Sequence, residues 1–568
     1  MSKSSLMTML RRAYGIARIS KKTGIPSDEL LEMVREAQSR NFRTTRRRLL
    51  QGGLGFAGAM AASNFFKGGQ RAMGQQTPIL IVGAGIAGLT AAYRLTQAGV
   101  PVNVIEARNR VGGRIKTMAK VAGTFLSADL GGEYIDSDHA IIRSLAAELG
   151  LTEVDLFANQ EGLVGTGYYF GRRFVPEAEL VADVAPVVER IEADLEAIDA
   201  FEDYTTVFPE VVELDNLSIT EYLEGIETTP LMRQILRVTY SVLYASDPDN
   251  QSSLNLIYFL GLDEGTFAPF GINDERYVIQ GGNQQITNQL ATFVSGSIET
   301  GTALEAISSL SDGRYQVSLR SGHSSFDRIY ERIVITLPFS VLREVQINVD
   351  LPPAKRLAID TMGYAPGSKL ITAYRDRIWR NYGFSSDVYS DLGFQHIEEA
   401  GQSRAALTPG VALLTNYTGG TQGLAIGSST AQLQAKQQLP QYELVYPGIT
   451  NTAIFGNAVR AYWPGDIYSR GAYSSYLPGQ WTQMYGVEGE RVGNLFFAGE
   501  HTSLEYQGYM EGGCETGEIA AMEILEDLGL QGNVEAMKVR RGSNLNNQEK
   551  VRRRPKLAEK QRKRFTGN

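Results

Sequence analysis

Thiols, imidazoles and long apolar runs are scarce in this sequence. Only one of its 568 residues is cysteine, Cys514, which excludes an intrachain disulfide and a redox centre made of two cysteines. The four histidines are scattered, and their spacing does not resemble a set of metal ligands, so we expect no metal. Any electron transfer must therefore use a bound organic group.

Positive charge is concentrated at the two ends of the chain. Residues 1–78 contain 14 Lys and Arg against 4 Asp and Glu, and residues 538–568 contain 12 against 2. The part between them is therefore strongly acidic, although the net charge is only −8. An acidic body attracts small cationic substrates, but an ordinary solvated acidic surface gives the same count. We expect the basic region 531–568 to be disordered and to attract an anionic membrane surface rather than nucleic acid.

Paired arginines near the N-terminus precede a short, weakly apolar run. The stretch TTRRRLLQGGLGFAGAMAAS, residues 44–63, is too short and too polar to span a bilayer as a stable helix. It resembles a twin-arginine export signal, although the segment before it is longer than in most such signals. A basic linker is the alternative. We expect residues 1–77 to form a basic N-terminal region and the protein to be exported to the periplasm or an equivalent lumen.

A glycine-rich turn connects a predicted buried strand to a predicted helix. In PILIVGAGIAGLTAAYRL, residues 78–95, an apolar run leads directly into Gly83, Gly85 and Gly88. Such a turn lets a pyrophosphate approach the backbone at the positive end of the helix. The following VPVNVIE predicts a second strand that ends at Glu106, where a carboxylate can accept hydrogen bonds from ribose hydroxyls. The segment therefore predicts dinucleotide binding.

The residues after this carboxylate distinguish NAD from FAD. In EARNRVGGRI, residues 106–115, two cations and a second glycine pair stand where NAD enzymes usually continue with an ordinary helix. The stretch resembles the flavin-containing amine oxidases and their relatives, and ADLGGEYI at 128–135 resembles their segment beside the flavin. The resemblance implies FAD. Because no second strand-led glycine fingerprint follows, as a separate NAD domain would need, we expect the substrate itself to reduce the flavin.

A C-terminal stretch extends the resemblance to about residues 78–530. The sequence NLFFAGEHTSLEYQGYMEGGCETGEIAAMEILEDLG, residues 494–529, is similar to the monoamine oxidase C-terminal motif. The resemblance implies an α/β fold, in which a discontinuous Rossmann-like FAD-binding domain (78–155, 274–350 and 455–530) holds an inserted α+β substrate domain (156–273 and 351–454). It implies that the residues binding FAD are Gly83, Gly85, Ile86, Ala87, Gly88, Glu106, Ala107, Arg108, Gly113, Arg114, Gly131, Gly132, Glu133, Trp463, Glu500, Gly508, Tyr509 and Met510.

The same resemblance assigns the residues that act on the substrate. Lys369 stands where the family has a lysine that holds a water against flavin N5. Tyr473 and Tyr509 match the two walls of an aromatic cage that receives the amine. Ala472 replaces the cysteine through which the mammalian monoamine oxidases attach FAD, so we expect noncovalent FAD. Cys514 is expected to fill core space.

These features predict the oxidative deamination of a primary amine. Flavin N5 would take a hydride from the C–N carbon, the imine would hydrolyse to a carbonyl and ammonia, and O₂ would reoxidise the flavin to give H₂O₂. A quinone is the alternative acceptor. The small-molecule partner is an amine or an amino acid, and the oligomeric state is not indicated.

Two alternatives remain open. An L-amino acid oxidase or dehydrogenase, for basic amino acids, needs a cation for the α-carboxylate. Many such enzymes have Arg where this chain has Tyr134, although GRRF at 171–174 could supply a cation. More distantly, carotenoid desaturases and porphyrinogen oxidases share the N-terminal glycine motifs, but they do not require Lys369 together with paired tyrosines.

Overall fold

The computed structural model describes residues 77–160, 162–260, 273–406 and 410–545. The twin-arginine run and the basic segment after residue 545 lie outside these ranges, so the predictions of export and membrane attraction rest on the sequence alone. Within the described ranges, none of the helices is both long and apolar enough to cross a bilayer.

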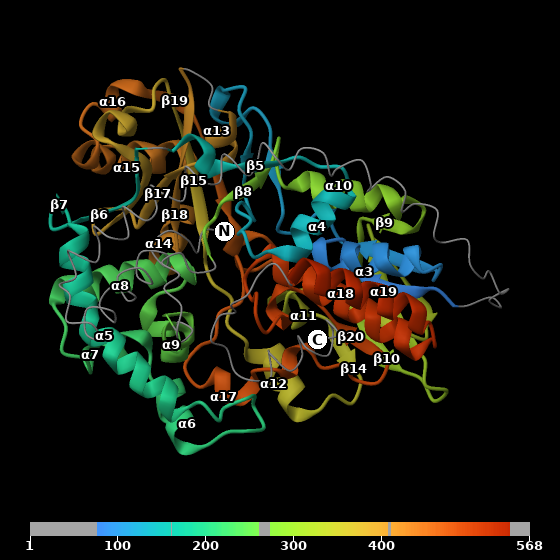
Figure 1. The fold of residues 1–568 in the computed structure, drawn as a ribbon. Coiled ribbons are helices and arrows are strands. Elements are labelled where there is room, and N and C mark those ends of the chain that lie inside the picture. The colour runs from blue at the N-terminus through green and yellow to red at the C-terminus, as the bar shows by residue number, and fades with distance from the viewer. Residues whose placement is uncertain (1–76, 161, 261–272, 407–409, 546–568) are drawn as a thin grey trace.

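A five-stranded parallel sheet is the centre of one half of the molecule (Figure 1). The strand β1 (Ile79–Val82) is its middle strand, and all four of its residues are buried. Ile79 and Ile81 pack with the helical layer, whereas Leu80 and Val82 pack on the opposite side. This burial on both faces explains the continuous apolar run in the sequence. The other strands are β2 (Val102–Glu106), β9 (Ile298–Thr300), β13 (Ile333–Ile335) and β20 (Leu495–Phe497).

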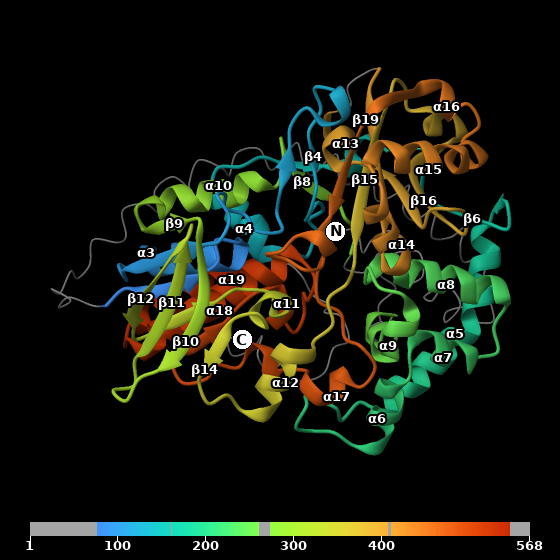
Figure 2. The same ribbon diagram turned by 180° about the vertical axis from the view of Figure 1, so that it is seen from behind.

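Helices cover one face of this sheet, and a second sheet covers the other. Figure 1 views the molecule from the helical side and Figure 2 from the side of the second sheet. The helices are α3 (Ile86–Gln97), α4 (Ala140–Glu148), α10 (Gln284–Phe293), α18 (Met510–Asp527) and α19 (Gln531–Leu545). The strands of the second sheet are, in order, β12 (Ser324–Tyr330), β11 (Tyr315–Ser321), β10 (Thr302–Ser309) and β14 (Gln346–Asn348).

A seven-stranded, mainly antiparallel sheet and a group of helices form the other half. The strands are, in order, β19 (Ala453–Tyr462), β15 (Ser368–Tyr374), β18 (Ala412–Thr418), β17 (His396–Glu399), β16 (Phe384–Ser390), β6 (Val164–Phe170) and β7 (Arg173–Phe174). Its helices include α5 (Glu177–Ala197), α6 (Pro209–Asn216), α7 (Ile219–Glu224), α8 (Pro230–Leu243), α9 (Ser253–Leu260), α13 (Gly401–Ala406), α14 (Gly420–Ala425), α15 (Ala431–Val445) and α16 (Ile449–Thr452).

Short elements connect the two halves. The pairs β3 (Thr117–Met118) with β4 (Ala128–Asp129) and β5 (Glu153–Asp155) with β8 (Tyr277–Ile279) are two-stranded. The helices α11 (Phe339–Leu342), α12 (Pro353–Thr361) and α17 (Gln480–Met484) lie along the remaining connections. The sheets and helices thus agree with the predicted α/β fold class.

Two predicted boundaries are wrong. β19 pairs along most of its length with β15, so it belongs to the seven-stranded sheet and not to a FAD-binding segment that begins at 455. Residues 531–545 form α19 instead of a disordered tail, because Val534 and Met537 bury apolar side chains in the helical layer. Arg541 is 2% exposed and forms ion pairs with two glutamates of α18.

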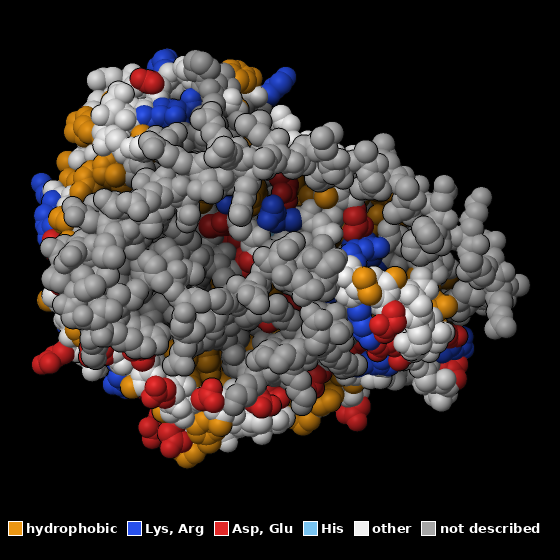
Figure 3. Space-filling view, in the orientation of Figure 1, with side chains coloured by type: hydrophobic (Ala, Val, Ile, Leu, Met, Phe, Trp, Pro, Cys, Tyr) orange, Lys and Arg blue, Asp and Glu red, His pale blue; other side chains and the backbone are white. Residues whose placement is uncertain are grey.

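Acidic side chains follow one edge of the face drawn in Figure 3, over α6, α17 and α12. Basic side chains also occur on this face, so the acidic side chains along this edge are not the only charged groups there. The picture agrees with the segment count, which places the negative charge on the body of the chain. Surface charge alone does not select a substrate, so the site must decide it.

Candidate active site and cofactor cavity

The glycine turn has the geometry that the sequence predicts. Gly83 has φ +106°, and its N–H donates to the Ile105 carbonyl oxygen at 2.8 Å. A Cβ at Gly88 would lie 2.0 Å from the Gly83 carbonyl oxygen, so only glycine lets α3 pack this close to the turn. A Cβ at Gly85 would meet nothing within 4 Å, because this residue faces open space. No described side chain caps α3, so its first N–H groups are available to an anion.

That open space is a cavity of about 460 Å³ at the carboxyl ends of the parallel strands. Most of the predicted FAD-binding residues line it, although they come from segments that are far apart in sequence. They are Gly83, Gly85, Ile86, Ala87, Glu106, Ala107, Arg108, Gly113, Arg114, Gly132, Glu500, Gly508, Tyr509 and Met510. An uncapped helix, a bare glycine and a ribose-type carboxylate along one cavity fit a dinucleotide such as FAD.

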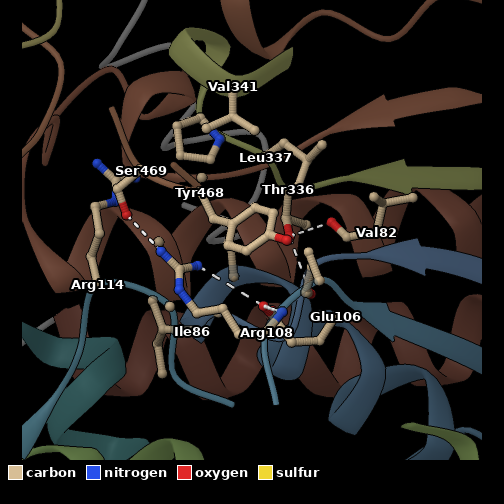
Figure 4. Close-up of a pocket in the computed structure, with 18 of the residues that line it drawn as sticks. Val82, Ile86, Glu106, Arg108, Arg114, Thr336, Leu337, Val341, Tyr468 and Ser469 are labelled. Atoms are coloured by element: carbon tan, nitrogen blue, oxygen red, sulfur yellow. Dashed lines mark hydrogen bonds and ion pairs between the residues drawn. The ribbon is translucent and has the colours of Figure 1, made fainter. Parts of the chain in front are cut away.

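A network around Glu106 and Arg108 organises one part of the cavity (Figure 4). The Glu106 carboxylate accepts hydrogen bonds from Ala84 N at 2.9 Å and from Arg108 N at 2.8 Å. The Arg108 guanidinium donates to Ser469 Oγ at 3.0 Å and forms an ion pair with Asp466. The Tyr468 ring lies 5.3 Å from the same guanidinium. Arg108 is thus held by a loop, residues 466–469, whose residues were not among the predicted site residues.

Glu500 organises another part of the cavity. Its carboxylate accepts hydrogen bonds from Arg114 at 2.7 Å, from Ser474 Oγ at 2.7 Å and from Gly508 N at 2.7 Å. Burial alone would raise the pKa of Glu500, but the Arg114 charge and these hydrogen bonds hold it below its usual value. Glu500 therefore joins three loops through an ionised carboxylate. Whether it also contacts FAD stays a prediction.

Lys369 is buried beside the cavity rather than lining it. Its Nζ donates to the carbonyl oxygens of Asp129 and Gly131, each at 3.1 Å, and forms an ion pair with Glu133. Glu133 also accepts a hydrogen bond from Gly401 N at 2.7 Å. Glu133 thus holds the lysine instead of lining the cavity. The predicted water bridge from Lys369 to the flavin stays a prediction.

Two more of the predicted residues have structural roles next to the cavity. A Cβ at Gly131 would lie 1.8 Å from the Arg114 carbonyl oxygen, so glycine is required there. Trp463 donates its Nε1–H to the Leu130 carbonyl oxygen at 3.0 Å. Gly88, Gly131 and Trp463 do not line the cavity themselves, but they pack against the backbone of the residues around it. Their predicted contact with FAD stays untested.

The two predicted cage tyrosines lie at different depths. Tyr509 lines the cavity, and its hydroxyl accepts a hydrogen bond from Asn273 Nδ2 at 2.6 Å. Tyr473 is fully buried, and its hydroxyl donates to the Leu243 carbonyl oxygen at 2.9 Å. The Tyr417 hydroxyl lies 3.0 Å from that of Tyr473. Burial first, and then Tyr417 and Tyr509, raise the pKa of Tyr473 well above its usual value, so its hydroxyl stays neutral.

Several cavity walls and the tyrosine behind Tyr473 were not predicted from the sequence. The missed walls are Thr302–Glu305, Arg320, Thr336–Pro338, Val341, Glu344, Val345 and Ile467–Arg470. Tyr417 was missed because its place depends on strand register, which pairs it with Lys369 across β15 and β18. Strand register cannot be read from this sequence, so the sequence alone does not place Tyr417 opposite Lys369.

The predicted source of a carboxylate-binding cation is wrong. Arg172 lies in the exposed turn between β6 and β7, and Arg173, the exposed first residue of β7, forms an ion pair with Glu179. Arg404 on α13 is instead close enough to act on the pKa of Tyr134. Within the described ranges, the one close group of possible metal ligands is Asp136, Asp138 and His139. There the His139 ring accepts a hydrogen bond from Asp136 N at 3.0 Å and so stabilises its own turn.

The profile of the family described as flavin containing amine oxidoreductase matches residues 86–525. The chain belongs to this family. This amine oxidoreductase is similar to a flavin-containing amine oxidase of Oncorhynchus mykiss, with 26% identity over 471 residues, 79% of this chain and 86% of the relative. Flavin-containing amine oxidase B of Mus musculus is 25% identical over 475 residues, 80% of this chain and 88% of the relative.

Solved structures share the fold of this amine oxidoreductase. Cyclohexylamine oxidase from Brevibacterium oxydans IH-35A superposes with a TM-score of 0.68 at 21% identity, covering 80% of this chain and 99% of that one. Putrescine oxidase bound to putrescine superposes with a TM-score of 0.66 at 19% identity, covering 79% and 99%. Membership of this family shows that the protein is an FAD-dependent oxidoreductase that acts on small-molecule amines with O₂ as acceptor.

FAD is held in this amine oxidoreductase without a covalent bond to cysteine. Ala472 occupies the expected linkage position, and Cys514 is fully buried in the helical layer, where burial raises the pKa of its thiol. We therefore expect acid precipitation to release the yellow cofactor into the supernatant. Flavin fluorescence that stays with the denatured polypeptide would contradict this expectation.

Proposed function

We propose that the amine oxidoreductase catalyses the oxidative deamination of a primary amine without an α-carboxylate. The observation that carries this proposal is the charge around Tyr134, the residue that replaces the arginine of many L-amino acid oxidases. Burial first, and then the charges of Glu133 and Glu398, raise the pKa of its buried hydroxyl; Glu275 acts in the same direction and Arg404 in the opposite one. Glu133 is already paired with Lys369, so Arg404 is the one base of this group left for a substrate carboxylate, and a carboxylate buried without a cation is unfavourable.

The glycine turn at Gly83–Gly88, Glu106 and Arg114 would hold FAD, which would supply an acceptor for a hydride from the C–N carbon of the amine; the imine would then hydrolyse to a carbonyl and ammonia, and O₂ would be reduced to H₂O₂. The chain's own residues shape the approach of the substrate. Tyr509 offers a ring at the cavity wall, while the hydrogen bonds of Tyr473 fix the second ring in place. Lys369 is held by Glu133 and two carbonyl oxygens, so its Nζ stays at a fixed position near Gly131.

Matched substrate pairs test the proposal. We expect cadaverine and agmatine to be oxidised with kcat/KM values at least as high as those of L-lysine and L-arginine. The measurement is peroxide formation by purified FAD-loaded protein under identical conditions. A tenfold or larger preference for the amino acids, about 1.4 kcal/mol in transition-state binding, would overturn the amine assignment.

Arg404 favours a second candidate function, the oxidation of basic L-amino acids. Its Nε–H is buried without a hydrogen-bond partner in the described part of the chain. Glu398, Asp387 and Glu399 are near enough to act on its pKa. Such a guanidinium could receive an α-carboxylate. If kcat/KM is higher for the amino acids than for the amines, Arg404→Met should remove that preference and leave amine oxidation in place.

A further inference from the structure

Glu398 is a buried carboxylate with no hydrogen-bond or ion-pair partner among the described residues. It is 1% exposed on β17, and its Oε1 is completely buried. The neighbouring Glu399, by contrast, forms an ion pair with Arg377. Burial raises the pKa of Glu398 to about 7, so the carboxyl group can be neutral on its own and ionise when a cation supplies the missing partner.

Strand register shows which way Glu398 projects. Glu398 lies directly opposite Thr415 on β18, and two residues further along the same strand Tyr417 lies opposite Lys369 of β15. Opposite and alternate residues share one face of an antiparallel sheet. Glu398 therefore projects from the same face as Lys369 and Tyr417, one step away from the hydroxyl pair that Tyr417 makes with Tyr473.

A second unpartnered group lies beside the carboxylate. Thr415 is fully buried, and its Oγ1 has no hydrogen-bond partner within the described ranges. Two of the cations nearby are already engaged, because His396 is bound to Asp387 at 2.6 Å and Lys369 is paired with Glu133. Arg404 is near enough for Glu398 to act on its pKa, but no hydrogen bond or ion pair joins the two side chains within the described ranges. Two oxygen atoms without a hydrogen-bond partner among the described residues thus lie on the same face of the sheet as Lys369 and Tyr417.

We propose that Glu398, with Thr415 beside it, binds the second ammonium group of a diamine whose first amino group is oxidised between Tyr473 and Tyr509. The inference rests on the proposed function and narrows its substrate class to terminal diamines. An ammonium group has three N–H donors, so it can satisfy both oxygens at once. A charge-assisted hydrogen bond in a buried site is strong enough to decide between a diamine and the corresponding monoamine.

The test compares terminal diamines, from diaminopropane to diaminohexane, with the monoamines of the same chain length. In Glu398→Gln we expect kcat/KM for the best diamine to fall about 10²-fold or more, because one partner of a buried charge pair is removed. The monoamine values should stay within about threefold. Glu398→Asp keeps the charge on a shorter side chain, so it should restore part of the activity and shift the optimum to a longer diamine.

Glu399→Gln is the matched control, since it makes the same change at the next residue, on the opposite face of the strand. It should leave the ratio of diamine to monoamine activity unchanged. FAD content per polypeptide verifies that each variant is folded. If Glu398→Gln is poorly loaded, Thr415→Val supplies the second measurement and should also lower the diamine-to-monoamine ratio.

The outcomes separate this inference from the proposed function. Monoamine oxidation with a ratio that Glu398→Gln and Thr415→Val leave unchanged would overturn the diamine site alone. Absence of peroxide and of flavin bleaching with every amine would overturn both. A preference for L-lysine that is lost in Arg404→Met and in Glu398→Gln alike would replace the diamine with a basic amino acid.

Discussion

Lys369→Met is expected to slow flavin reduction or reoxidation by about 10² to 10⁴-fold while FAD stays bound. Lys369 Nζ is 3.1 Å from the carbonyl oxygens of Asp129 and Gly131, and Gly131 precedes Gly132, a cavity residue, so the lysine lies close to the cavity wall. The arginine and carboxylate groups that organise the cavity lie on other loops. Stopped-flow absorbance of the flavin, with substrate under anaerobic conditions and then with O₂, measures the two half-reactions separately.

This substitution also affects stability, and a double variant separates the two effects. Removing Lys369 leaves Glu133 as a buried carboxylate without its cation, which typically costs about 3–5 kcal/mol. In Lys369→Met/Glu133→Gln that charge is gone, so much of the lost stability should return. The slow half-reaction should remain slow. If the double variant regained the rate, the role of Lys369 would be to fold the site and not to act in it.

The sequence revealed best those parts of the site that are local in the chain. Gly83, Gly85 and Gly88 with Glu106 lie within one strand–helix–strand unit, so their spacing alone predicts the turn and its carboxylate. Arg114 and the 500–510 segment could be assigned because the family motif includes them, although the ion pair between Arg114 and Glu500 could not. Local pattern predicts an element, whereas a contact across the fold needs the tertiary arrangement.

The missed residues share a physical cause. Glu398, Thr415 and Tyr417 meet Lys369 only through the register of three strands, and register is set by long-range pairing. Arg404 reaches the site because α13 follows β17 directly at Gly401, where Glu133 binds its N–H. The prediction of disorder for residues 531–545 failed for another reason. A high content of Lys and Arg concealed the apolar face of α19, which packs on α4 and α18.

Glu500→Gln is expected to weaken retention of FAD by about 10²-fold or more and to lower thermal stability. The side chain is a buried acceptor for Arg114, Ser474 and Gly508, and the amide keeps its shape while losing the charge and one acceptor. Breaking a buried ion pair on one side typically costs about 3–5 kcal/mol, because the remaining charge is left without compensation. Because Arg114 and Gly508 both line the cavity, the loss falls on the cofactor site itself.

Glu344→Gln is the matched control for this prediction, because Glu344 lines the same cavity but makes an ion pair with Arg470 in which both side chains are about half exposed. Exposed pairs contribute about 0–1 kcal/mol, so its retention of FAD and its melting temperature should stay close to those of the parent.

The low pKa of Glu500 adds a pH test. A carboxylate whose pKa is lowered on folding stabilises above its unfolded pKa, about 4.3, and loses this effect as the pH falls through the folded value. The parent should therefore release FAD more readily as the pH falls below about 4.3, whereas Glu500→Gln should show a flatter profile. Equal retention by Glu500→Gln and Glu344→Gln at neutral pH would show that the Arg114–Glu500 pair does not hold the cofactor loops together.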